Sequence, residues 1–255
     1  MVSLLDTAHE AVKKYGFIGI RCSTRPDKID DEVLTILRSR SVTSIELGAQ
    51  SMSDRVLMMN DRGHLSEDVR TASKLIKEYG FELGLQMMTG LYGSEPEDDI
   101  YTAEELIKLK PDTVRIYPTI TLENTKLADL YRSGEYVPMK LDDAVELCSE
   151  LIDRFEKNDI RVIRVGLHSS PELQYESVAG PFHPAFRELC MSRSLVKEVS
   201  SELAKQDKRT AEIHVNPKLV SAMTGQKRSN ISLLENLGYT VKLVQDKNVE
   251  RFFIK

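Results

Sequence analysis

Apolar runs and segments of helical spacing alternate over the first two-thirds of the chain. Each apolar run holds few polar residues, as in Phe17–Ser23, which is typical of a buried strand. The segments between the runs repeat apolar residues every three or four positions, which predicts amphipathic helices. We predict strands at residues 17–23, 44–49, 81–91, 113–120 and 160–167, and helices at 30–40, 53–59, 66–80, 96–110, 125–134 and 141–158. Strands that alternate with helices predict βα units and a parallel sheet, so the expected fold class is α/β.

The last third of the chain has a different pattern. A long helical segment at residues 184–205 precedes a strand, a short helix, a turn, a second helix and a further strand, which lie between residues 210 and 245. The turn between the two short helices is Gly225–Arg228. We therefore predict an α/β domain at residues 1–170, a helical connection at 171–206 and a small basic α/β domain at 207–255.

Charge is distributed unevenly along the chain. The 255 residues carry a net charge of -5, yet Lys205–Lys255 holds ten Lys and Arg against five Asp and Glu, about +5. The rest of the chain is then about -10. A basic tail on an acidic body indicates a polyanionic partner for the tail, whereas bulk charge does not favour polyanion binding by the whole chain.

The cysteines show no metal or redox spacing. Cys22, Cys148 and Cys190 lie far apart in the sequence, and the charged, amphipathic N-terminus is unlike a signal peptide. No apolar run approaches the roughly 20 residues of a membrane span. We expect a cytoplasmic protein with reduced thiols and no membrane partner.

Polar and glycine-rich or proline-rich clusters follow four of the predicted strands. They read "STRPD" at residues 23–27, "GAQS" at 48–51, "QMMTGLYG" at 86–93 and "YPTI" at 117–120. The carboxyl ends of parallel strands meet at one edge of a sheet, and that edge holds the active site in barrels and open α/β sheets. The clusters therefore predict a ligand site there, although ordinary βα loops remain the alternative.

Several of these motifs together resemble a known family. "STRPD", "ELGAQS", "DRGH", "LQMMTGL", "VRIYPT" and "LADLYRSGEY" occur in this order over about residues 17–167. They resemble the radical SAM domain of the Elongator catalytic subunit family, most closely its bacterial members without an acetyltransferase domain. A more distant resemblance is to coproporphyrinogen III dehydrogenases.

The resemblance implies a partial (βα) radical SAM barrel with S-adenosylmethionine (SAM) and a 4Fe-4S cluster at the carboxyl edge of its strands. It implies that Gln50 and Arg62 contact the methionine or ribose part of SAM and that Gln86 faces the ribose. Tyr117 and Pro118 would line the same mouth. Arg62 is suited to pair with the ligand carboxylate through two hydrogen bonds.

Two departures from the family stand out. Ser23 replaces the glutamate that relatives often carry, so the expected contact to the SAM amino group lacks its carboxylate. The C-x-x-x-C-x-x-C loop that holds the cluster is absent, and counting strands makes residues 17–23 the third strand of the barrel. We expect a fragment that begins inside the domain and lacks the first strands of the barrel. The alternative is a degenerate relative that keeps the scaffold without the chemistry.

The resemblance implies an enzyme that modifies the wobble uridine of tRNA with SAM and a 4Fe-4S cluster. This chain would be a fragment of that enzyme and would be inactive alone. One alternative is a non-catalytic RNA-binding relic. The other is a coproporphyrinogen dehydrogenase-like enzyme, which the basic tail disfavours. The turn at Gly225–Arg228 resembles the GXXG loop of KH domains, so Lys227 and Arg228 are expected to contact RNA phosphates. A solvated helical hairpin is the alternative for that turn.

A few residues keep two interpretations. Glu46 belongs either to the ligand site or to an ion pair with a neighbouring strand. His64 is either a turn residue or a ligand contact. The acidic run Glu97–Asp99 indicates a helix N-terminus. A sheet edge left open by missing strands predicts self-association.

Overall fold

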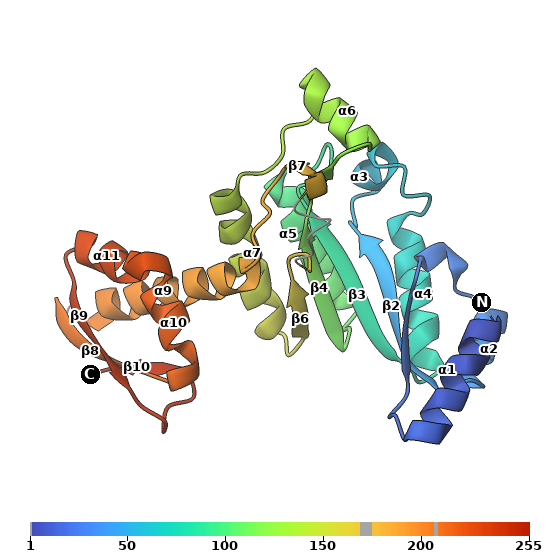
Figure 1. The fold of residues 1–255 in the computed structure, drawn as a ribbon, viewed down its shortest axis with the longest axis horizontal. Coiled ribbons are helices and arrows are strands. Elements are labelled where there is room, and N and C mark those ends of the chain that lie inside the picture. Colours follow the sequence, from blue (N-terminus) through green and yellow to red (C-terminus); the bar gives the residue numbers. More distant parts are fainter. Residues whose placement is uncertain (1, 169–174, 207–208) are drawn as a thin grey trace. The chain divides into compact units, whose positions relative to one another are not determined.

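The computed structural model describes residues 2–168, 175–206 and 209–255. The chain divides into two compact units (Figure 1). The first comprises Met1–Ala144 and Leu151–Phe182, and the second comprises Val145–Glu150 and His183–Lys255. No helix in the described ranges is long and apolar enough to cross a membrane.

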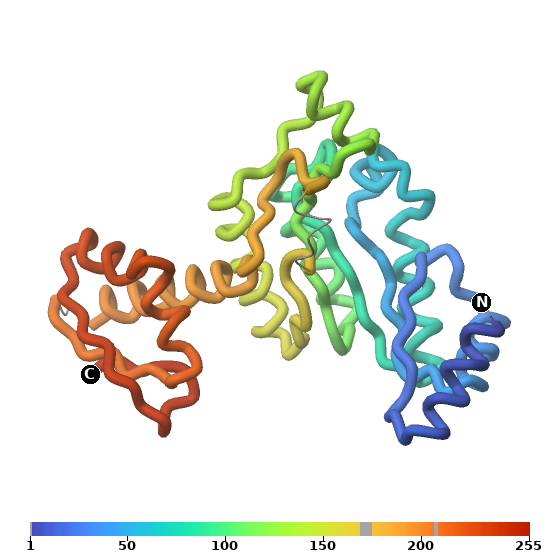
Figure 2. Tube along the Cα trace, in the orientation of Figure 1, coloured from blue at the N-terminus to red at the C-terminus, as the bar shows by residue number. Residues whose placement is uncertain are grey.

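A parallel sheet of five strands forms the centre of the first unit. Its strands follow one another in the order β1-β2-β3-β4-β6, and Figure 2 traces this order as the colour passes from blue to yellow. The strands are β1 (Ile20–Thr24), β2 (Val42–Gln50), β3 (Glu82–Thr89), β4 (Thr113–Pro118) and β6 (Arg161–Val165). Strands that add in sequence order on one side are the arrangement of a barrel, so the expected α/β fold with a parallel sheet is confirmed.

Helices connect the strands of this sheet. Asp30 caps one of them, because its carboxylate accepts a hydrogen bond from Val33 N at 2.8 Å, and Gly134 (φ 81°) ends another. The helices of the first unit are α1 (Val2–Tyr15), α2 (Asp31–Arg38), α3 (Asp54–Met59), α4 (Ser66–Glu78), α5 (Pro96–Lys108) and α6 (Lys126–Ser133), with α7 (Leu141–Glu156) shared between the units and a short 3-10 helix η1 at Pro26–Lys28.

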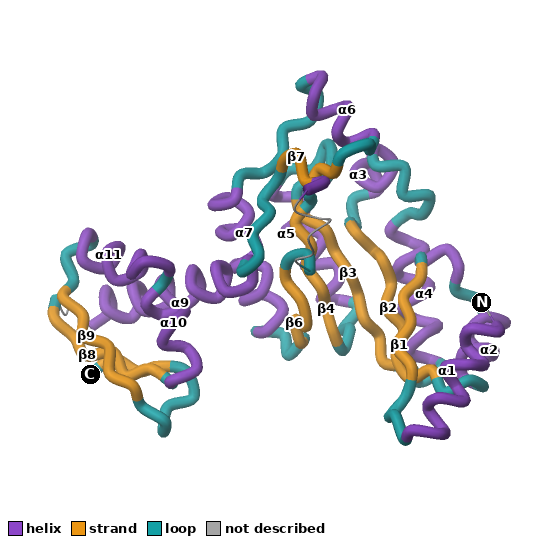
Figure 3. The backbone as a smooth tube through the Cα atoms, viewed as in Figure 1, coloured by secondary structure: helices purple, strands orange, loops and turns teal. Residues whose placement is uncertain are grey.

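The two faces of the five-stranded sheet differ in character. Alternate side chains point to opposite faces of a strand, and paired residues of parallel strands share a face. The apolar face is fully buried, and α4 and α5 lie against it, behind the strands in Figure 3. Its central residues are Ile45, Leu47, Leu83, Leu85, Val114 and Ile116. The opposite face, which we call the polar face, carries Arg21, Ser23, Glu46, Glu82, Gln86, Arg115, Tyr117 and Arg161.

β1 is an edge strand of the sheet. The chain just ahead of it exposes Phe17 (60%) and Ile18 (100%). Self-association through this edge stays a prediction. Elsewhere in the first unit, β5 (Thr121–Leu122) and β7 (Ser177–Ala179) form a small antiparallel ladder.

The second unit has its own sheet in the order β10-β8-β9. β8 and β9 are parallel, while β10 runs antiparallel to β8. The elements are α9 (Phe186–Gln206), β8 (Thr210–Val215), η2 (Pro217–Leu219), α10 (Val220–Thr224), η3 (Gln226–Arg228), α11 (Ser229–Asn236), β9 (Thr240–Gln245) and β10 (Phe252–Ile254). The expected order of strand, short helix, turn, helix and strand is present.

Helix α9 is part of the core of the second unit. Its residues Leu195, Val196, Val199 and Leu203 pack with the buried residues of β8, α10 and α11. The expected division differs here, because residues 171–206 were assigned to a separate connection. A helix with an apolar face of this size gains most of its stability by burying that face, so α9 folds with the sheet that follows it.

Candidate functional site

The residues expected to bind SAM come from neighbouring strands of the first unit. Ser23 pairs with Glu46 of β2, Gly48 of β2 pairs with Gln86 of β3, and Tyr117 of β4 pairs with Met88. The structure therefore brings Ser23, Gln86 and Tyr117 to the polar face, towards the carboxyl edge of the sheet. Their roles toward a ligand remain predictions.

Gln50 ends β2 in an unusual conformation. Its φ is 65°, in the left-handed region that non-glycine residues rarely adopt, and its side chain is only 8% exposed. The amide lies over Gly48, where an added Cβ would come within 2.6 Å of Nε2. Among the residues that the structure describes, none hydrogen-bonds to this amide, which is also not among the fully buried polar atoms without a partner. Gly48 is the register partner of Gln86, so the Gln50 amide lies beside that residue.

Glu46 is the centre of a charged network on the polar face. It is 1% exposed, its Oε2 lies 3.0 Å from Arg115 Nε and 3.8 Å from Arg21 Nη1, and Gln86 Nε2 donates a hydrogen bond to its Oε1. Gly84 leaves room for it, because a Cβ there would lie 3.1 Å from Glu46 Cγ. The structure thus shows the ion pair with neighbouring strands that one interpretation of Glu46 expected.

Sequence reasoning missed the arginines of this face. Arg115 Nη1 donates to the Tyr117 hydroxyl at 3.3 Å. Glu82 Oε1 accepts from Arg21 at 3.0 Å and from Arg161 at 3.3 Å. The alternating positions of these residues in predicted strands were the available signal. Their partners depend on the register between strands, which the sequence alone does not give.

Arg62 lies in the loop after α3 and lines a hollow of about 470 Å³. Its Nε is buried without a hydrogen-bond partner, and no carboxylate in the described part of the chain forms an ion pair with it. Burial lowers the pKa of Arg62 from its usual value, and the positive charge of Arg25 lowers it further. A desolvated cation without a counter-ion is suited to bind an anionic group.

The motif after β1 holds this loop in place. Arg25 donates to Gly63 O at 3.0 Å and to both carboxylate oxygens of Asp27, at 2.8 and 2.9 Å. The hydrogen bond from Arg25 lowers the pKa of Asp27 to about 2. His64 is 5% exposed and its Nε2 donates to Ala49 O at 3.1 Å. His64 is therefore a buried contact between the loop and the end of β2, and its interpretation as a ligand contact stays a prediction.

A buried carboxyl fixes the loop after β3. Asp99 is 2% exposed and accepts hydrogen bonds from Gly90 N at 2.9 Å and from Ser94 Oγ at 2.8 Å. Burial outweighs these two bonds and raises the pKa of Asp99 to about 7. The Tyr136 hydroxyl donates to Gly90 O at 2.8 Å, and burial raises the pKa of that tyrosine to about 12. Helix α5 begins at Pro96, so the helix N-terminus expected at Glu97–Asp99 is confirmed.

The cysteines of this chain do not fit a 4Fe-4S cluster. Cys22 lies half-buried on β1 in the first unit, whereas Cys148 and Cys190 are buried in the second. A cluster of this kind needs thiolates that converge on one site. Within the described ranges, no group of three or more His, Cys, Asp or Glu side chains is placed to hold a metal ion.

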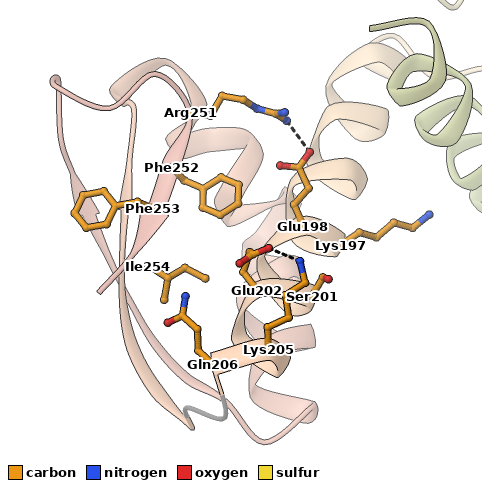
Figure 4. Close-up of a pocket in the computed structure, with 10 residues that line it drawn as sticks. All are labelled: Lys197, Glu198, Ser201, Glu202, Lys205, Gln206, Arg251, Phe252, Phe253 and Ile254. Carbon is orange, nitrogen blue, oxygen red and sulfur yellow. Dashed lines mark hydrogen bonds and ion pairs between the residues drawn. The ribbon is translucent and has the colours of Figure 1, made fainter. Parts of the chain in front are cut away.

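A hollow of about 720 Å³ lies between α9 and β10 in the second unit (Figure 4). Its cations already have partners, since Arg251 pairs with Glu198 at 3.1 Å and Lys205 with Glu202 at 2.7 Å. We therefore assign no anion site to it.

The turn before α11 presents two exposed cations. Lys227 (φ 49°) and Arg228 (φ 67°) follow Gly225 and form no ion pair with any described residue. An added Cβ on Gly225 would lie 2.9 Å from Asn230 N, so only glycine fits there. The structure places the predicted RNA contacts side by side on the surface, and RNA binding itself remains a prediction.

Comparison with known proteins identifies the family. Residues 3–107 match the Radical SAM superfamily, and residues 111–197 match the Radical_SAM C-terminal domain. The chain belongs to the radical SAM superfamily. Two similar curated relatives of this radical SAM chain are the tRNA uridine(34) acetyltransferase of Methanocaldococcus jannaschii, 32% identical over 135 residues, and human Elongator complex protein 3, 32% identical over 138 residues.

These alignments cover 52% and 53% of this chain and 25% of each relative, so the chain spans about a quarter of their length. Among solved structures, the archaeal Methanocaldococcus infernus Elp3 with an N-terminal deletion is similar with a TM-score of 0.63 and 26% identity. That match covers 74% of this chain and 42% of the archaeal one. The resemblance to Elongator-type radical SAM proteins is thereby confirmed.

Proposed function

We propose that the carboxyl edge of the first unit binds SAM and that the intact protein modifies the wobble uridine of tRNA. The observation that carries the proposal is Arg62, a half-buried guanidinium whose Nε has no hydrogen-bond partner, at the edge where its family binds SAM. The amide of Gln50 supports it, because it forms no hydrogen bond with a described residue and can both donate to and accept from a ligand.

Each residue of the site has a distinct part in this proposal. Arg62 binds the carboxylate of the methionine moiety, and Gln50 both donates to and accepts from its polar groups. Gln86 accepts from the ribose, and Tyr117 forms a wall of the mouth. Ser23 offers only a hydroxyl where relatives often carry a carboxylate, so it contributes the weakest contact. When bound beside a reduced 4Fe-4S cluster, SAM supplies a group that abstracts hydrogen atoms from a substrate.

We further propose that the cluster ligands belong to a segment outside this sequence, since the three cysteines present do not fit. This chain alone is then expected to bind SAM weakly and to perform no radical chemistry. The tRNA-related names of the relatives support tRNA as the substrate of the intact protein. Lys227 and Arg228 would grip the tRNA backbone through its phosphates.

An RNA-binding protein without radical chemistry is the second candidate. The missing cysteine motif is the observation that favours it. A C-x-x-x-C-x-x-C segment in the reading frame ahead of Met1 would decide for the enzyme.

Calorimetric titration with SAM tests the ligand site. We expect the parent chain to bind more weakly than micromolar, and Arg62→Ala to lose about tenfold or more in affinity, because one charge-assisted contact contributes about 1.5–3 kcal/mol. Arg132→Ala is the matched control and should leave binding unchanged, since Arg132 is an exposed arginine of α6 that pairs with Glu123. Equal SAM affinity of the Arg62→Ala variant and the parent would refute the proposed role of Arg62.

A further inference from the structure

The hydrogen bond between Gln86 and Glu46 connects the proposed ribose contact to a fully buried carboxylate. Gln86 Nε2 donates to Glu46 Oε1, so the amide of Gln86 is not free to rotate. Glu46 is the register partner of Gly84, which precedes Gln86 on β3. The donor is therefore directed toward β2, and an amide whose nitrogen is held in this way has its oxygen available as an acceptor.

The same carboxylate holds a second residue of the site through Arg115. Its Oε2 lies 3.0 Å from Arg115 Nε, and Arg115 Nη1 donates to the Tyr117 hydroxyl at 3.3 Å. Glu46 thus contacts Gln86 of β3, which is itself a predicted ligand residue, and Arg115 of β4, which contacts the predicted ligand residue Tyr117. A buried carboxylate with charged and amide partners fixes their orientation more strongly than a neutral group would.

We infer that Glu46 is a positioning residue of the SAM site, which orients Gln86 so that its amide oxygen can accept from the ribose hydroxyls. This inference rests on the proposed function. Glu46 itself touches no ligand in it. Preorganisation by residues behind the contact surface is a general requirement of precise sites.

The polar face offers a matched control for Glu46. Glu82 is also a glutamate of that face and pairs with two arginines, Arg21 and Arg161, but it has no bond to Gln86 or Arg115. Replacing either residue by glutamine keeps the shape and removes one negative charge. Any effect of charge alone should therefore appear in both variants.

The test is a calorimetric titration of the full chain with S-adenosylhomocysteine, a stable analogue of SAM. Glu46→Gln should weaken binding about tenfold or more, and Glu82→Gln should stay within about twofold of the parent. Gln86→Ala should weaken binding too, and adding Glu46→Gln to it should cost little more, because Glu46 acts through Gln86. A role confined to stability would not give this non-additive pattern.

A second variant, in which Glu46 and Gln86 exchange residue types, tests the inference if Glu46→Gln alone does not fold. In the double variant Glu46→Gln with Gln86→Glu, the donor and acceptor are swapped, and the new carboxylate lies beside Arg115, the register partner of residue 86. This variant should recover most of the parent affinity. Its failure to bind while folded would overturn the inference.

The outcomes distinguish a wrong role for Glu46 from a wrong ligand site. If Gln86→Ala weakens binding and Glu46→Gln does not, the inference about Glu46 is wrong and the site stands. If the parent fails to bind the analogue, or if neither Arg62→Ala nor Gln86→Ala affects binding, the proposed site is wrong and the role of Glu46 falls with it.

Discussion

Arg62 of the first unit has a buried Nε without a hydrogen-bond partner and forms no ion pair with any described residue. Folded proteins rarely leave such groups unpaired, because the lost contacts with water are not replaced. Unpaired buried polar groups occur mainly in binding sites, because a bound ligand forms the hydrogen bonds that the protein lacks. The same logic separates Arg62 from the paired arginines of the polar face, whose charges are already balanced.

Gly84 leaves space for the Glu46 side chain on the polar face of the sheet. An added Cβ would lie 3.1 Å from Glu46 Cγ and 3.1 Å from Thr113 Oγ1, closer than side chains normally pack. We expect Gly84→Ala to lower the free energy of unfolding by about 1–3 kcal/mol, as measured by urea denaturation.

Thr113→Ala in the Gly84→Ala background provides the control for this prediction. It removes one of the two crowding atoms and should return part of the lost stability. If Gly84→Ala is as stable as the parent, a Cβ at residue 84 does not clash with Glu46 or Thr113.

At the scale of elements, the loop after β3 is tied to α5 and to the segment after α6. Asp99 on α5 accepts from Gly90 and Ser94, while Tyr136 donates to the Gly90 carbonyl. This loop follows the strand that carries Gln86. Its attachment is therefore expected to order the mouth of the proposed site.

The raised pKa of Asp99 predicts a pH-dependent stability. Its pKa is about 7 in the folded chain against a usual value of 3.8, so folding favours the neutral acid. The stability that Asp99 contributes is complete below about pH 3.8 and is lost as the pH rises through 7. Between pH 5 and 8, the stability of Asp99→Asn should rise relative to the parent by about 2–3 kcal/mol.

Urea unfolding of both proteins at several pH values measures this difference. Glu97→Gln is the control, because Glu97 is exposed in the same first turn of α5, and its difference from the parent should stay nearly constant. A parent and an Asp99→Asn variant whose stabilities change in parallel would show that Asp99 is already ionised at low pH.

At the scale of the whole molecule, the basic second unit is expected to supply the RNA affinity. Replacing both Lys227 and Arg228 by glutamate should weaken tRNA binding strongly and flatten its salt dependence by roughly one unit per lost phosphate contact. The same change at Lys13 and Lys14, two exposed residues of α1, is the control and should have a much smaller effect. Polarisation titrations at two salt concentrations measure both quantities.

Stability should not change in the Lys227 and Arg228 variant beyond about 0.5 kcal/mol, because both side chains are exposed. If this variant binds tRNA as tightly as the parent, the turn is a solvated hairpin and the RNA contact lies elsewhere.

Much of the first unit could be predicted from the sequence, because apolar runs and helical periods are local signals. The strand ends could be predicted for the same reason, and the residues expected from the family resemblance come from neighbouring strands. The network around Glu46 could not, since it requires the register that pairs Glu46 with Gly84 and Gln86 with Arg115. The missing partner of Arg62 is likewise a property of three-dimensional packing. Helix α9 was assigned to a connection because its apolar face does not reveal in sequence which sheet it covers.

The order of strands distributes the residues of the proposed SAM site unequally between the edge and the centre of the sheet. Gln50, Gln86 and Tyr117 lie on β2, β3 and β4, each of which has a hydrogen-bonded neighbour on both sides, while Ser23 lies on the edge strand β1. Local opening begins where a strand has one neighbour, so amide hydrogens of β1 should exchange with deuterium well before those of β3. Fraying of β1 would then detach Ser23 alone and leave the three other side chains in register.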